Sequence, residues 1–82
     1  MDDPKIKLAS ARLEAAKLRT RAAHQAEQAA IYRRQAAKPI YDGQAEFCRS
    51  KAEMAESLAD ENRARADLIE AQAEATGQEP PR

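Results

Sequence analysis

The sequence predicts an all-α protein: an antiparallel helical hairpin with alanine-rich coiled-coil packing, which dimerises into a four-helix bundle. Strong helix formers fill two long stretches, and one short segment with proline and glycine separates them. Alanine recurs every seventh residue in both stretches, and small side chains at this heptad spacing let helices approach closely along a seam. The two ladders are Ala9, Ala16, Ala23, Ala30 and Ala37, then Ala45, Ala52, Ala59, Ala66 and Ala73.

We expect the first helix at about residues 4–37. The Asp3 side chain can accept a hydrogen bond from an early backbone amide, and Pro4 suits the first helical position because no N–H is needed there. From Lys5 to Ala37 the chain has no glycine or proline. Alanine, leucine, arginine, lysine, glutamine and glutamate dominate this stretch, and these residue types favour helix most strongly.

A turn is predicted at residues 38–43. Pro39 disfavours helical geometry at the residue before it, and Gly43 provides a second break. Asp42 is the candidate N-terminal cap of the second helix, because its side chain can accept a hydrogen bond from an early amide of that helix. The turn lets the chain reverse, so that the two helices lie antiparallel.

The second helix is expected at about residues 43–76, with Gly77 ending it. Residues 78–82 contain two prolines, and we expect them to form a disordered tail. Residues 1–77 therefore make up a single helical hairpin domain.

A second interpretation is a nearly continuous rod that is kinked at Pro39 and dimerises in parallel, because the two alanine ladders are only one residue out of phase. The hairpin is favoured because Pro39 and Gly43 together break a helix more thoroughly than a proline alone. Residues 1–41 carry nine basic and four acidic residues, a net charge of +5, and residues 42–82 carry five basic and ten acidic residues, a net charge of −5. A hairpin places these opposite charges side by side.

The first helix carries two seams that could contact a neighbour. One is its alanine ladder, and an antiparallel alignment of the two ladders places Ala23 opposite Ala59 with the centre at Tyr41. The other seam contains larger side chains, and the sequence leaves open which seam faces the second helix. Because a helix with two seams can contact two neighbours, we expect self-association. The second seam consists of Leu8, Ala11, Ala15, Leu18, Ala22, Gln25, Ala29, Tyr32 and Ala36.

The core of such a hairpin is thin. The chain contains 20 alanines, which outnumber its larger apolar residues, and each buried methyl group contributes only ~0.8 kcal/mol. We therefore predict a non-enzymatic interaction module, such as a regulator, adaptor or assembly factor, that associates with itself and with another protein through helix faces. The residues expected at the protein interface are Leu8, Leu18, Tyr32, Met54, Leu58 and Leu68.

Catalysis and cofactor binding are not expected. His24 is the single histidine and Cys48 the single cysteine, and neither lies in a recognisable nucleophile motif. Carboxylates would have to supply most ligands of any metal site, and two glycines are too few for a glycine-rich phosphate loop. We expect no enzymatic activity, no cofactor, no metal and no small-molecule substrate.

Nucleic-acid binding is the alternative function. In this interpretation a dimeric hairpin acts as a regulator that presents the basic face of its first helix to phosphate groups. The aromatic residues cluster around the turn, away from the arginines, which weakens the case for base stacking. The candidate nucleic-acid contacts are Arg12, Lys17, Arg19, Arg33 and Lys38.

The sequence also lacks features of a membrane protein. No stretch approaches the ~20 apolar residues that cross a bilayer. The opening MDDPKIK lacks the apolar core of a signal peptide. We therefore expect a cytoplasmic protein without a membrane partner.

Overall fold

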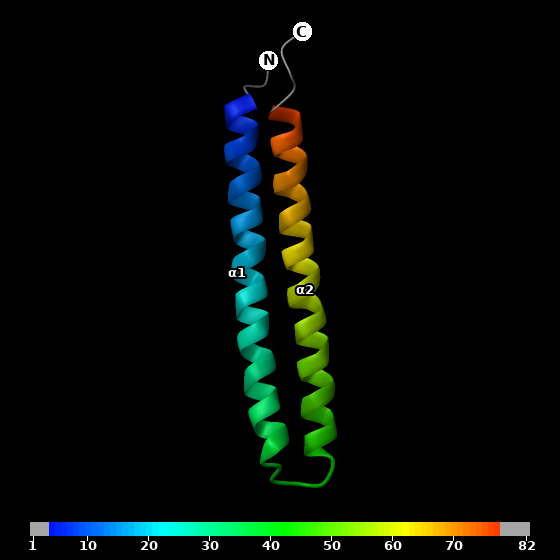
Figure 1. The fold of residues 1–82 in the computed structure, drawn as a ribbon. Helices are drawn as coiled ribbons and strands as arrows, with labels where there is room; N and C mark the ends of the chain where they lie inside the picture. The colour runs from blue at the N-terminus through cyan, green and yellow to red at the C-terminus, as the bar shows by residue number, and fades with distance from the viewer. Residues whose placement is uncertain (1–3, 78–82) are drawn as a thin grey trace.

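The computed structural model describes residues 4–77, which form two long helices joined by a loop (Figure 1). Helix α1 spans Pro4–Ala37 and helix α2 spans Gln44–Gly77, and each contains 34 residues. The helices lie side by side and run in opposite directions, because the chain reverses at residues 38–43. The predicted antiparallel helical hairpin is therefore confirmed, and the alternative of a continuous rod kinked at Pro39 is wrong.

The turn depends on one glycine and a few hydrogen bonds. Gly43 has a positive φ of 87°, a conformation that glycine adopts without the steric cost a side chain would bring. Its carbonyl accepts the first helical hydrogen bond of α2, from the Phe47 amide at 3.0 Å, so Gly43 is the N-cap residue. Gln44 Oε1 accepts a hydrogen bond from the Ile40 amide across the loop. The expected cap, Asp42, lies one position too early, and its side chain bonds to no described residue, so that prediction is wrong.

Two further predictions concern the ends of the chain. The Asp3 cap of α1 and the tail at residues 78–82 lie outside the described residues. Helix α2 begins at Gln44, one residue later than the sequence suggests.

The core is a row of small side chains between the two helices. Leu18 forms a cluster with Ala15 and Ala66, and Ile69 packs against this cluster from α2. Six of the eight buried apolar residues in the described chain are alanine, so each contributes little free energy through its burial. The buried set is Ala15, Leu18, Ala22, Ala29, Cys48, Ala52, Ala59 and Ala66.

The seam of α1 that faces α2 is not its alanine ladder. All five ladder residues of α1 are exposed, whereas Ala15 and Ala22 of the other seam are fully buried. The expected pairing of Ala23 with Ala59 is therefore wrong. The buried seam also carries two leucines, including Leu18, and a tyrosine, so facing it inward removes more apolar area from water than burying only methyl groups.

Polar side chains interrupt this core at two levels. The Asn62 side-chain amide donates to Gln25 Oε1 at 2.9 Å in a partly buried position. Closer to the turn, the Cys48 thiol donates to Gln35 Oε1 across 3.6 Å. If one helix slipped along the other, these polar atoms would lose their partners in a partly buried environment. Both contacts therefore favour a single register of the hairpin.

Candidate functional site

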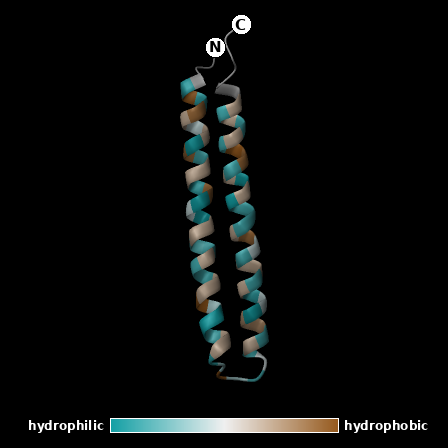
Figure 2. Ribbon diagram, in the orientation of Figure 1, coloured by the Kyte–Doolittle hydropathy of each residue, from teal (hydrophilic) through white to brown (hydrophobic). Residues whose placement is uncertain are grey.

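Four large apolar side chains lie on the outside of α2 and form what we call the α2 stripe. Phe47, Met54 and Leu68 share one heptad position, which Glu61 occupies between Met54 and Leu68, and Leu58 lies beside them. Their exposed fractions range from 45% to 58%. The buried alanines of α2 follow a different heptad position, so the stripe points away from α1. In Figure 2 strongly hydrophobic positions appear as separate brown patches along both helices, between hydrophilic ones.

The two sides of the α2 stripe carry different charges. Lys51 and Arg65 lie on one side, and Lys51 Nζ is 5.5 Å from the centre of the Phe47 ring, within range of a cation–π interaction. A column of acidic residues, the acidic column, runs along the other side. It consists of Glu46, Glu53, Asp60, Asp67 and Glu74, and the small residues Ser50, Ser57, Ala64 and Ala71 separate it from the stripe.

The outside of α1 carries a second apolar surface, the α1 edge. Ile6 and Leu13 are 67% and 59% exposed, and the exposed alanine ladder runs beside them. Cations border this edge, with Arg12 on one side and Lys17 and Lys38 on the other. Within the described chain none of these three cations forms an ion pair. The α1 edge therefore combines two large apolar side chains and the alanine ladder with unpaired cations on both sides, and beyond Leu13 its column continues with Thr20, Glu27 and Arg34.

The predicted interface residues divide between two environments. Leu18 is buried in the hairpin core, and Leu8 and Tyr32 are half-buried in the same seam. Helix α2 covers these three side chains wholly or in part, so of the two seams that the sequence leaves open, this one faces α2. The exposed members of the predicted set, Met54, Leu58 and Leu68, belong to the α2 stripe.

The interface set predicted from the sequence omits three exposed apolar residues of these surfaces. Phe47 continues the heptad spacing of Met54 towards the turn, and Ile6 and Leu13 are seven residues apart beside the α1 ladder. That spacing is the signal that could have identified them. The spacing becomes informative once it is known that the seam containing Leu18 faces α2 and leaves the other faces exposed.

Two arginines of α1 reach acidic groups on α2. Arg19 donates to Asp67 at 2.8 Å and also to Glu70, and Arg33 Nε donates to Glu56 Oε2 at 3.0 Å. Hydrogen bonding to Asp67, then to Glu70, raises the pKa of Arg19, and hydrogen bonding to Glu56 raises the pKa of Arg33. Both arginines are candidate nucleic-acid contacts, but in the hairpin their guanidinium groups are already paired with carboxylates.

The five candidate nucleic-acid contacts do not form one face. Arg12, Arg19 and Arg33 follow one column of α1, whereas Lys17 and Lys38 lie on the far side of the alanine ladder. Because two of the arginines are also paired with acids, the described part of α1 presents no continuous positive ridge.

The Glu56 carboxylate provides a direct test of the cross-helix ion pairs. Hydrogen bonding from Arg33 holds the pKa of Glu56 below its ordinary value of 4.5. A carboxyl group whose pKa is lowered by folding stabilises the folded state above its unfolded pKa, and this contribution is lost as the pH falls through the lower, folded value. We expect an NMR titration to give a lower pKa for Glu56 in the wild-type chain than in Arg33→Gln. Equal values in the two chains would show that the pair does not form in solution.

The described residues contain no group of three or more His, Cys, Asp or Glu side chains arranged to hold a metal ion. His24 is on the exposed surface of α1, with its Nε2 3.3 Å from Gln28 Nε2. The single thiol, that of Cys48, is buried between the helices. Neither α1 nor α2, over the residues described, combines the length and the hydropathy that a membrane-spanning helix requires.

Comparison with known proteins gives no family assignment. No protein family, no curated protein and no solved structure was found to match this chain. The surfaces of the hairpin are therefore the basis for a functional proposal.

Proposed function

We propose that this chain is a non-enzymatic interaction module whose outer helix faces bind other helices, in the manner of a regulator, adaptor or assembly factor. The distribution of large apolar side chains supports this most strongly. Nine of them are exposed, whereas Leu18 is the only one that is buried in the described chain. The exposed set is Ile6, Leu13, Ile31, Ile40, Tyr41, Phe47, Met54, Leu58 and Leu68.

The free energy available from the outside of the hairpin is comparable to that of its core. A single core in a domain of this size rarely supplies more than about 3–5 kcal/mol, and this core is mostly alanine. Fully burying one large apolar side chain contributes about 1.5–3 kcal/mol. Covering the four side chains of the α2 stripe would therefore add several kcal/mol before the entropic cost of association is subtracted. A partner that binds only the folded hairpin also stabilises it.

A helix is the element that fits these surfaces best. The large side chains of the α2 stripe recur at helical spacing, and small residues lie beside them. This pattern offers gaps into which the side chains of another helix can insert, as knobs do in a coiled coil. Grooves of this kind bind amphipathic helices through positions three, four and seven residues apart.

Capture of partners from the native cell tests the proposal. We compare the wild-type chain with a stripe variant, Met54→Gln/Leu68→Gln, and with a control variant, Arg21→Gln/Arg49→Gln, which changes exposed residues outside both apolar surfaces. We expect the wild type and the control to retain the same proteins after nuclease treatment and at high salt. The stripe variant should lose them.

Two results would contradict this expectation. Equal capture by the stripe variant would show that the outside of α2 does not bind a partner. Capture that disappears with nuclease, or that falls steeply as salt is raised, would favour the alternative of a nucleic-acid-binding regulator.

A further inference from the structure

We propose that hairpins of this chain associate head to tail, with the α2 stripe of one copy packed against the α1 edge of a second copy. This inference rests on the proposed function, because it names the helix that occupies the α2 stripe. The directions of the two surfaces, their charges and their shapes support it.

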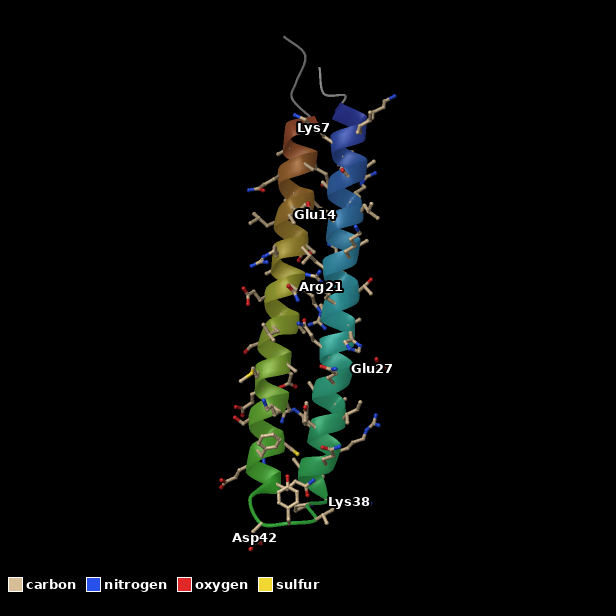
Figure 3. The ribbon with its side chains drawn as sticks, turned by 180° about the vertical axis from the view of Figure 1, so that it is seen from behind. Lys7, Glu14, Arg21, Glu27, Lys38 and Asp42 are labelled. Atoms are coloured by element: carbon tan, nitrogen blue, oxygen red, sulfur yellow. The ribbon has the colours of Figure 1, made fainter. Side chains whose placement is uncertain are left out.

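The α1 edge and the α2 stripe point in nearly opposite directions. Each faces away from the buried seam, as the exposure of Leu13 and Met54 shows. The two sides of the hairpin between these surfaces are polar. One side carries the cross-helix ion pairs, and along the other side Lys7, Glu14 and Arg21 follow one another (Figure 3).

This arrangement disfavours the closed four-helix bundle that the sequence suggests. Such a bundle requires apolar faces of both helices on the same side of the hairpin, so here it would bury one of the polar sides at a cost in desolvation. A contact between opposite surfaces instead joins hairpins in a row, or in a ring if the rotation between copies closes.

Charges left unpaired within one hairpin are complementary between two copies. Arg12, Lys17 and Lys38 border the α1 edge without an ion pair in the described chain, and the acidic column borders the α2 stripe. Within the column only Asp60 and Asp67 form ion pairs with described residues. Docking an α2 stripe on an α1 edge therefore brings opposite charges together along the acidic column, whereas along the other side of the stripe Lys51 and Arg65 meet cations of the edge.

Contacts between two identical surfaces, either two α1 edges or two α2 stripes, are less favourable. Two α1 edges would bring cations close to cations, which opposes association. Two α2 stripes would cover each other but would leave Ile6 and Leu13 of both copies in water. The head-to-tail contact covers both kinds of surface at every joint.

The shapes of the two surfaces also match. Phe47, Met54 and Leu68 project from α2 at heptad positions, and the α1 edge presents alanines with the same seven-residue repeat. Large side chains of one helix can lie over the alanines of another, so the helices approach closely and exclude water from both. The alanine ladder, which the hairpin itself does not bury, would then line an interface between copies.

Two complementary variants test the contact in the purified protein. Met54→Glu/Leu68→Glu blocks the α2 stripe, and Leu13→Glu/Ala16→Glu blocks the α1 edge. All four positions are exposed, so circular dichroism should show unchanged helix content. Glutamate is used in both variants so that the two blocked surfaces repel each other.

Sedimentation velocity gives the readout. We expect the wild-type chain to form species that grow with concentration, each variant alone to be monomeric, and an equal mixture of the two variants to form a dimer. The mixture can form only one joint, between the free α1 edge of the first variant and the free α2 stripe of the second.

Other outcomes overturn the head-to-tail contact. If Leu13→Glu/Ala16→Glu dimerises alone, the joint is between two α2 stripes. If the mixture remains monomeric, or if the wild-type chain is monomeric, copies of this chain do not occupy the stripe. The proposed function can still succeed in that case, because the capture experiment detects a different protein on the α2 stripe.

Discussion

Replacing Leu18 with aspartate is expected to unfold the hairpin. Leu18 is 8% exposed and packs with Ala15, Ala66 and Ile69. Truncating a buried leucine costs about 2–5 kcal/mol, and placing a carboxylate among apolar groups adds a desolvation penalty. Because a single core of this size rarely supplies more than about 3–5 kcal/mol, little or no stability should remain. Far-UV circular dichroism should therefore show the loss of most of the helical signal.

The matched control is Leu13→Asp on the same helix. Leu13 is 59% exposed, so the same change of residue type removes no side chain from the core. We expect this variant to keep the helical signal at low protein concentration. If Leu18→Asp and Leu13→Asp have equal effects, the assignment of the buried seam is contradicted.

Two adjacent alanines should respond differently to enlargement. Ala22 is fully buried against α2, and Ala23 is exposed. Ala22→Leu forces a larger side chain into a close-packed seam, which typically costs about 1–3 kcal/mol. In a domain of this size each kcal/mol lowers the melting temperature by about 4–8 °C. We expect a drop on this scale for Ala22→Leu in thermal unfolding followed by circular dichroism.

Ala23→Leu should leave the melting temperature nearly unchanged at low protein concentration. Leucine is almost as good a helix former as alanine, so the substitution itself costs little in an exposed helical position. The reverse order, with Ala23→Leu the more damaging change, would mean that the alanine ladder of α1 faces α2 after all.

The fold could be predicted from the sequence because its determinants act locally. Pro39 and Gly43 interrupt the chain within a few residues of the reversal, and no glycine or proline interrupts α1 from Lys5 to Ala37. The cap of α2 is a partial exception. Its position depends on the left-handed conformation of Gly43, which moves the cap one residue beyond Asp42.

The faces of the helices could not be assigned in the same way. Ala22 and Ala23 both belong to seven-residue repeats, so periodicity alone does not separate the buried seam from the exposed ladder. The choice depends on how much apolar area each seam buries against α2, and Leu18 decides it in favour of one seam.

The candidate site depends on the same choice. The apolar character of Met54 and Leu68 is evident from the sequence, but their exposure follows from the heptad position of α2 that α1 covers. For the same reason the sequence predicts Leu18 to be an interface residue, whereas in the structure it is a core residue. The α1 edge becomes a candidate surface only when the ladder is known to be outside.

Photo-crosslinking from Met54 in the native cell tests most directly whether another helix covers the outside of α2. A benzophenone amino acid at Met54 is compared with the same group at Arg49, which is exposed on α2 but lies outside the α2 stripe. We predict a discrete crosslinked product from Met54, mapping to a helix of a second copy or of another protein, and none above background from Arg49. If neither position gives a product, or if both give the same products, the outside of α2 is not a binding surface and the proposed function is wrong.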